Sequence, residues 1–168
     1  ILLPTQPIQP PPSEENETLE PATSIDGQTN NIVKEIKSRE EVINTTKRVS
    51  FKNSSINGSI NLKGGIIDDL ILSKYKISLE PGSENIQLLS PDGTANPYYI
   101  ETGWKEINNT NLDLPNLETE WESDSLVLTP TNPVSLTWTN NQNITFKVNY
   151  AIDDEYMFSI TQEVINNS

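Results

Sequence analysis

The 168-residue sequence contains no cysteine and no histidine. Without cysteine there is no disulfide and no thiolate chemistry, and without histidine the commonest general base and metal ligand is missing. A Ser-His-Asp catalytic device is therefore impossible within this sequence. Hydrophobic runs are also short, and none approaches the ~18 residues that a membrane-spanning helix needs.

Basic residues are scarce, with 11 Lys and Arg against 24 Asp and Glu and a formal net charge of −13. The balance is uneven: residues 46–76 are locally basic, whereas residues 77–168 hold only Lys105 and Lys147 among many carboxylates. Such a surface repels phosphate backbones and anionic lipid headgroups. Nucleic-acid binding is therefore not expected.

Aromatic residues are absent from residues 1–45, which instead begin with a cluster of prolines, Pro4, Pro7 and Pro10 to Pro12. Prolines favour an extended chain, and the polar, acidic residues that follow cannot bury a core. We therefore predict a disordered linker over residues 1–30. All Trp, Tyr and Phe lie in residues 46–168, so the hydrophobic core must be built there.

Short alternations of apolar and polar residues fill this second part. They predict strands near 47–52, 56–62, 66–73, 85–90, 97–104, 118–122, 125–128, 133–139, 143–151 and 156–165. Only one short helix is predicted, over residues 38–45, where Ser38 and Glu41 have the spacing of a capping box. Many strands and almost no helix predict an all-β sandwich or barrel.

One hairpin is especially well marked. Val134, Leu136 and Trp138 alternate with polar residues, and the same pattern follows from Ile144 to Tyr150 after an Asn-rich turn. The two runs are predicted to pair antiparallel, with Trp138 and Phe146 in the core.

Acidic groups are the remaining candidates for chemistry. Asp68 and Asp69 are adjacent in a strand, so their side chains are predicted to face opposite ways. Glu118, Glu120 and Glu122 share one strand face and suggest either a glycosidase pair or a solvated row. Two further clusters offer oxygen ligands for Ca²⁺ but are more typical of turns: Asp92-Gly93-Thr94 and Asp153-Asp154-Glu155. We assign no catalytic, cofactor-binding or metal-binding residue, and no residue is singled out for partner contacts.

Several segments resemble a known family by their order and spacing: RVSF, GSINLKGGIIDDLILSKY, LLSPDG, PYYIETGW, TEWESDS, LTPTNPVSLTW and YMFSITQEVINNS. They resemble the first part of the periplasmic domain of the YidC-type membrane protein insertases, in the version found in alphaproteobacteria. The resemblance implies a β-supersandwich with a galactose-mutarotase-like, two-sheet antiparallel core. It also implies a linker over residues 1–37 and a periplasmic β-sandwich domain over residues 38–168, which continues beyond Ser168 in the family.

The same resemblance implies a non-enzymatic interaction module on the periplasmic side of the bacterial inner membrane, without a cofactor. Its implied partners are the SecD-SecF accessory proteins of the Sec translocon and nascent membrane proteins. The membrane anchor is implied to lie outside this sequence. If the sandwich continues, the strand near 156–165 is an unpaired edge that carries Phe158, Ile160 and Val164.

Two rival hypotheses remain. A carbohydrate-binding or carbohydrate-active β-sandwich would use exposed aromatic residues on one face, for example Trp104 with Tyr98. A lipoprotein or adhesin-type surface domain is the third possibility, although the missing lipid-attachment cysteine counts against it.

Overall fold

The computed structural model describes residues 35–108 and 111–167, so the predicted linker over residues 1–30 lies outside the described part. The helix of the described part, α1, spans Arg39–Ile43. The Ser38 side chain accepts a hydrogen bond from the Glu41 amide, and the Ser38 amide donates to the Glu41 carboxylate at 2.7 Å. The predicted capping box is therefore confirmed. The hydrogen bond from the Ser38 hydroxyl to this carboxylate lowers the pKa of Glu41.

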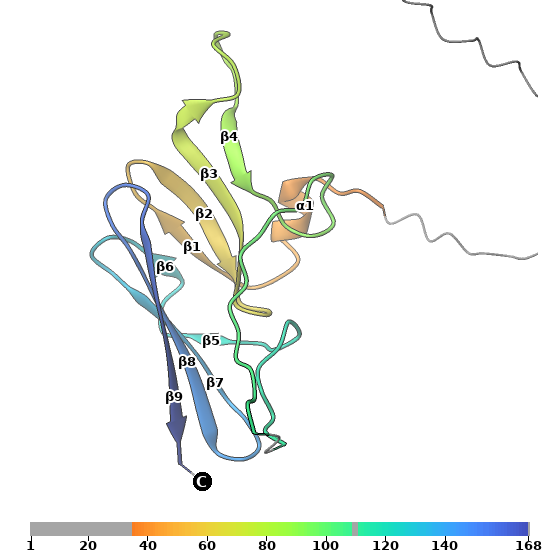
Figure 1. Ribbon diagram of the computed structural model, residues 1–168. Coiled ribbons are helices and arrows are strands. Elements are labelled where there is room, and N and C mark those ends of the chain that lie inside the picture. The colour runs from red at the N-terminus through yellow and green to blue at the C-terminus, as the bar shows by residue number, and fades with distance from the viewer. Residues whose placement is uncertain (1–34, 109–110, 168) are drawn as a thin grey trace, which may run out of the picture. The chain divides into compact units, whose positions relative to one another are not determined.

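The strands form two sheets, which confirms the predicted all-β sandwich (Figure 1). The first sheet has five strands in the order β4-β3-β2-β1-β6. Neighbouring strands run antiparallel except β6, which pairs parallel with β1. Its strands are β1 (Arg48–Lys52), β2 (Ile56–Asn61), β3 (Ile66–Lys76), β4 (Asn85–Leu89) and β6 (Val127–Leu128).

The second sheet has four antiparallel strands in the order β5-β7-β8-β9. They are β5 (Glu122–Ser123), β7 (Val134–Thr139), β8 (Ile144–Ile152) and β9 (Phe158–Asn166). The predicted hairpin is confirmed, because β7 and β8 pair in a register that places Trp138 opposite Phe146. Of these two aromatic residues, Phe146 is buried and Trp138 is half-buried.

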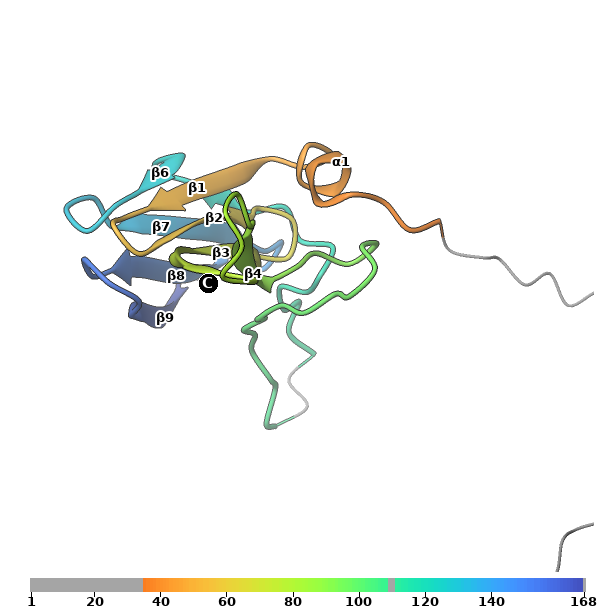
Figure 2. The same ribbon diagram turned by 90° about the horizontal axis from the view of Figure 1, so that it is seen from above.

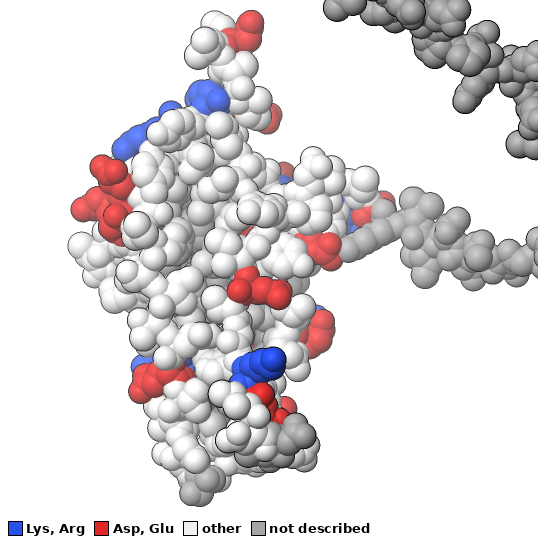
Figure 3. Space-filling view, in the orientation of Figure 1, with Lys and Arg blue, Asp and Glu red and all other residues white. Residues whose placement is uncertain are grey.

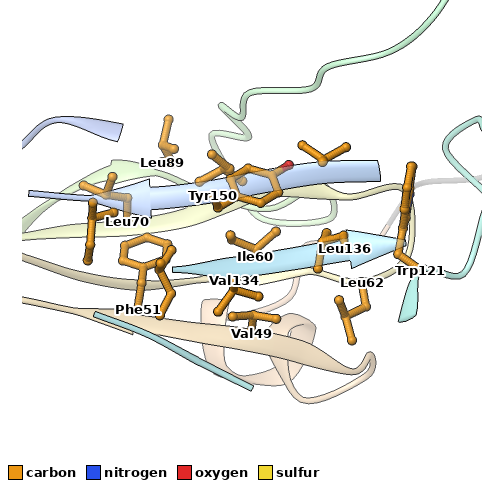
Figure 4. Close-up of a cluster of buried hydrophobic side chains, with 14 of the residues drawn as sticks. Val49, Phe51, Ile60, Leu62, Leu70, Leu89, Trp121, Val134, Leu136 and Tyr150 are labelled. Atoms are coloured by element: carbon orange, nitrogen blue, oxygen red, sulfur yellow. The ribbon is translucent and has the colours of Figure 1, made fainter. Parts of the chain in front are cut away.

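The two sheets lie in layers (Figures 1 and 2), and buried side chains from both sheets form one hydrophobic core. Alternate residues of β8 are buried from Ile144 to Ile152, which is the pattern of a strand with one face on a core. They meet side chains of the first sheet such as Phe51 and Ile60, and in the close-up Tyr150 and Ile60 lie in the same cluster (Figure 4). The Phe51 ring also packs edge-on against Phe158 of β9 at 5.1 Å.

Two predicted strands are wrong, and both failures have the same cause. In residues 97–104, Tyr98 pairs with Ser90 whereas Ile100 pairs with Ile67, so these two isolated bridges use different partners. The predicted strand 118–122 is replaced by a bridge at Glu120 and by β5, which begins at Glu122. The alternation of apolar and polar residues is a local pattern. It does not indicate that the backbone changes its pairing partner within a few residues.

The glycines between β2 and β3 explain the tight connection there. Gly64 and Gly65 have φ of 78° and 66°, a left-handed conformation that other residues rarely adopt. The predicted strands 56–62 and 66–73 leave a break at this pair, and the break between β2 and β3 is confirmed. Gly58 of β2 is needed for a different reason, because a Cβ atom there would lie 2.0 Å from the Asp69 carbonyl oxygen.

Tyr150 provides a test of this packing through its pH dependence. Its hydroxyl donates to the Gly65 carbonyl oxygen at 3.2 Å, and burial raises the pKa of Tyr150 to about 12 from 10.0. Since the unfolded chain loses this proton first, the stability that the neutral phenol contributes is lost as pH rises from 10 toward 12. We expect the unfolding free energy to fall by about 2–3 kcal/mol over this interval because of Tyr150.

Denaturant melts at pH 9 and pH 11.5 measure this effect. Tyr150→Phe lowers the stability at pH 9 but removes the alkaline loss that this residue causes. An equal alkaline loss in the wild type and in Tyr150→Phe would contradict the assignment.

Candidate functional site

A buried network of charges lies where α1 meets the first sheet. Arg48 donates to the Asp68 carboxylate and, through Nε, to the Ser59 hydroxyl at 2.7 Å. The Ser59 hydroxyl donates to Asp69 at 2.7 Å, and the Nε of Arg39 donates to the other oxygen of Asp69 at 2.6 Å. The Asp69 side chain is 2% exposed, so this chain of contacts fastens α1 to β2 and β3.

The prediction that Asp68 and Asp69 face opposite ways is wrong, because Arg48 and Ser59 connect the two carboxylates. The register between β2 and β3 shifts at Ser59, where Asp69 is opposite Ser59 but Ile67 is opposite Ile60. Such a bulge inserts one extra residue and turns its side chain. Both carboxylates therefore join one network, in which each has its own arginine.

This network is structural in character. Burial raises the pKa of Asp68, and the attraction of Arg48 opposes that shift. Each carboxylate is engaged by an arginine at short range, and Asp69 also accepts from Ser59. Groups held in this way stabilise a unique arrangement of strands. Asp68 also lines a hollow of about 210 Å³ together with Asp92 and Glu118.

The row Glu118, Glu120 and Glu122 is not a continuous strand face. Glu118 forms an ion pair with Lys63 at 2.6 Å, and the Glu118 side chain is 80% exposed. Glu120 and Glu122 line a small hollow of about 200 Å³ together with Trp138. Both glutamates are exposed on the surface, as the alternative of a solvated row predicted.

Both predicted oxygen-rich segments form turns, and in the first the Thr94 hydroxyl donates to the Pro91 carbonyl oxygen at 2.7 Å. The Asp153 carboxylate accepts from the Glu155 and Met157 amides at 2.8 and 2.9 Å. The Asn53 side chain donates to the carbonyl oxygens of Asp153 and Glu155, which ties the turn to the end of β1. Within residues 35–108 and 111–167, no three acidic side chains gather closely enough to hold a metal ion.

Aromatic residues form a cluster at the opposite end of β8. Trp104 stacks on Trp121 at 5.8 Å and meets the edge of Phe146 at 5.2 Å. Tyr98 is 67% exposed and takes no part in these ring contacts. The structure therefore does not bring Trp104 and Tyr98 together as one exposed aromatic platform.

An apolar hollow of about 370 Å³ opens beside this aromatic cluster. Its apolar lining residues come from β8, β9 and the segment before β5: Trp104, Ile107, Leu112, Leu114, Ile144, Phe146 and Val164. The sequence did not predict this hollow, because its lining joins residues about 60 positions apart. Its one sequence signal is the alternation in β9, which predicted an apolar row there.

On the face that Figure 3 shows, Asp and Glu form scattered patches with Lys and Arg among them. In the part of the chain that the structure describes, no helix is long and apolar enough to cross a membrane.

The geometry does not identify the protein family, and comparison with known proteins does. The model of the YidC periplasmic domain family matches residues 48–168, that is, from β1 through β9. The chain belongs to the YidC periplasmic domain family. The resemblance of the strand segments is thereby confirmed. The match includes the apolar hollow and, of the charge network, Arg48, Ser59, Asp68 and Asp69 but not Arg39.

Several relatives of this family are named membrane protein insertase YidC. The relative from Methylorubrum extorquens strain PA1 is 44% identical over 131 residues, which are 78% of this chain and 21% of the relative. The one from Rickettsia bellii is 44% identical over 121 residues, 72% of this chain and 22% of the relative. The one from Pelagibacter ubique is 42% identical over 132 residues, 78% of this chain and 23% of the relative. The chain thus spans less than a quarter of the length of these YidC relatives.

Proposed function

We propose that this chain is the first part of the periplasmic region of a membrane protein insertase and acts there as a non-catalytic interaction module. Membership of the YidC periplasmic domain family over residues 48–168 is the observation that carries the proposal. The lack of Cys and His supports the non-catalytic part, since a thiolate nucleophile and the commonest general base are missing.

In this proposal, residues 1–37 are a linker, residues 38–168 are the folded domain, and a membrane segment outside this sequence anchors the domain. The domain lies on the periplasmic side of the inner membrane, where it assists the integration and folding of membrane proteins in the manner of a chaperone. Its partners are nascent membrane proteins or the SecD-SecF accessory proteins. No observation favours the carbohydrate-binding alternative, because Trp104 packs against Trp121 instead of joining Tyr98 on the surface.

Photo-crosslinking tests the proposal. A photoreactive residue is placed singly at three exposed positions on different parts of the domain, Tyr98, Leu126 and Ile165. The purified chain is offered a stalled nascent membrane protein, a stalled nascent soluble protein, or the periplasmic parts of SecD and SecF. We expect crosslinks to the membrane protein or to SecD-SecF that clearly exceed those to the soluble protein. Equal labelling of all three, at every position, would overturn the proposal.

A further inference from the structure

Two tyrosines from different sheets meet at one end of the molecule. Tyr75 lies near the end of β3, and Tyr156 lies in the turn between β8 and β9. Their ring centroids are 6.2 Å apart, with an angle of 52° between the ring planes. All five tyrosines of the sequence fall in the described residues, and there this pair is the one ring contact between two of them. Each of the two therefore has a second phenol within reach.

Hydrogen bonds hold the turn that carries Tyr156 against the first sheet. The Asn53 side chain donates to the Asp153 carbonyl oxygen at 2.7 Å, and the Ser54 hydroxyl donates to the Asp154 carbonyl oxygen at 2.8 Å. Asn53 and Ser54 belong to the connection between β1 and β2. Contacts within the chain thus fix the position of the turn, and with it that of Tyr156.

Strand β3 brings Tyr75 to this turn. The end of β3 extends past its pairing with β2, in the same direction as the turn between β8 and β9 (Figure 1). On one side of Tyr75, the Ser73 amide donates to the Ser55 carbonyl oxygen at 2.8 Å. On the other side, Lys76 pairs with Asn85 of β4. The backbone around Tyr75 is therefore held at two points.

The two side chains are also suited to lose electrons together. Tyr75 is 51% exposed and Tyr156 is 40% exposed, so both rings are only partly packed and can turn toward each other. A hydrogen bond with the Tyr156 phenol raises the pKa of Tyr75, so Tyr75 is a neutral phenol at pH 7. The sequence has no cysteine, so no thiol competes for an oxidant and no disulfide can form.

We propose that Tyr75 and Tyr156 are a modification site at which a peroxide-dependent oxidant joins the two sheets through a dityrosine bond. The oxidant removes one electron and one proton from each phenol. The two radicals couple through a ring carbon beside each hydroxyl, and the hydrogen on each of those carbons moves to the phenolic oxygen. In total the chain gives up two electrons and two protons, which reduce one hydrogen peroxide to two water molecules.

Such a link has the effect on this cysteine-free chain that a disulfide has on others. It connects β3 of the first sheet to the β8–β9 turn of the second, and it closes a loop from residue 75 to residue 156. Closing a long loop restricts the unfolded chain and so favours the folded one. The periplasm, the location proposed above, is an oxidising compartment. The inference goes beyond the proposed function, and the chemistry depends only on the two side chains.

The test treats the purified chain, at low concentration, with a haem peroxidase and hydrogen peroxide. Gel filtration isolates the monomer, dityrosine fluorescence measures the link, and peptide mass spectrometry locates it. We expect a monomer that is lighter by two hydrogen atoms, in which the peptide of Tyr75 is joined to that of Tyr156. We also expect a higher urea midpoint for this product than for the untreated chain.

Two matched variants separate proximity from exposure. Tyr75→Phe keeps the ring but removes one phenol of the pair, whereas Tyr98→Phe removes a phenol that is more exposed, at 67%, and makes no ring contact with another tyrosine. Because proximity governs which radicals couple, we expect Tyr75→Phe to lower the dityrosine yield of the monomer at least about tenfold. Tyr98→Phe is expected to leave the yield within about twofold.

Each other outcome overturns the inference. These outcomes are no dityrosine in the monomer, a link that maps to other tyrosines or forms only between two chains, an equal yield in Tyr75→Phe, or an unchanged urea midpoint. If Tyr75→Phe fails to fold, the mapping in the wild-type chain still decides. None of these results bears on the crosslinking to nascent membrane proteins or to SecD-SecF, so the proposed function is tested separately.

Discussion

Truncating Phe146 to alanine is expected to lower the unfolding free energy by about 3–5 kcal/mol. The side chain is 2% exposed and occupies the centre of the aromatic cluster, with Trp104 at 5.2 Å and Trp138 at 5.8 Å. Its removal costs the transfer free energy of a phenyl ring and leaves a cavity that two rigid indole rings cannot easily fill. Urea melts followed by circular dichroism measure the loss.

Tyr156→Ala is the control for this prediction. Tyr156 is 40% exposed in the turn before β9, and truncation there is expected to cost under about 1 kcal/mol. A loss below about 1 kcal/mol for Phe146→Ala as well would mean that the register of the β7–β8 hairpin is shifted by one residue.

Arg48→Ala is expected to destabilise the protein by about 3–5 kcal/mol at pH 7, because it leaves the Asp68 carboxylate buried without its cation. The side chains of Arg48 and Asp68 are 9% and 7% exposed. Burial already raises the pKa of Asp68, and the loss of Arg48 removes the attraction that opposes this shift. The folded variant therefore binds a proton more tightly than the unfolded chain does.

This reasoning gives the sign of the pH dependence. An acid whose pKa is raised by folding contributes least above its folded pKa and most below its unfolded value. The penalty of Arg48→Ala is therefore expected to shrink as pH falls from 7 toward 4, relative to the wild type measured at the same pH. A penalty that grows as pH falls would contradict a buried, unpaired Asp68.

Lys63→Ala provides the matched control, since it also breaks an ion pair, at the connection between β2 and β3. The Lys63–Glu118 pair is 2.6 Å long but solvent-exposed, and its loss is expected to cost at most about 1 kcal/mol. The double change Arg48→Met with Asp68→Leu should recover much of the loss. Two apolar side chains can pack against each other in this buried position, whereas a single charge there has no partner.

The sequence by itself determined the elements whose signals are local. Alternation with period two identified β7 and β8 and their antiparallel pairing, because one buried face imposes that pattern. The capping box at Ser38 and the break at Gly64-Gly65 were likewise readable, since each depends on residues only a few positions apart. The order of the strand segments was enough to indicate the family.

Only the tertiary structure decided the features that depend on which segments meet. Residues 97–104 and 118–122 alternate like strands, but their backbones switch partners, so neither becomes the predicted strand. The bulge opposite Ser59 joins Asp68 and Asp69 in one network with arginines from α1 and β1. The apolar hollow beside β9 is assembled from segments far apart in the chain. Pairing partners, bulges and hollows arise from contacts distant in sequence, and a pattern of neighbouring residues does not encode them.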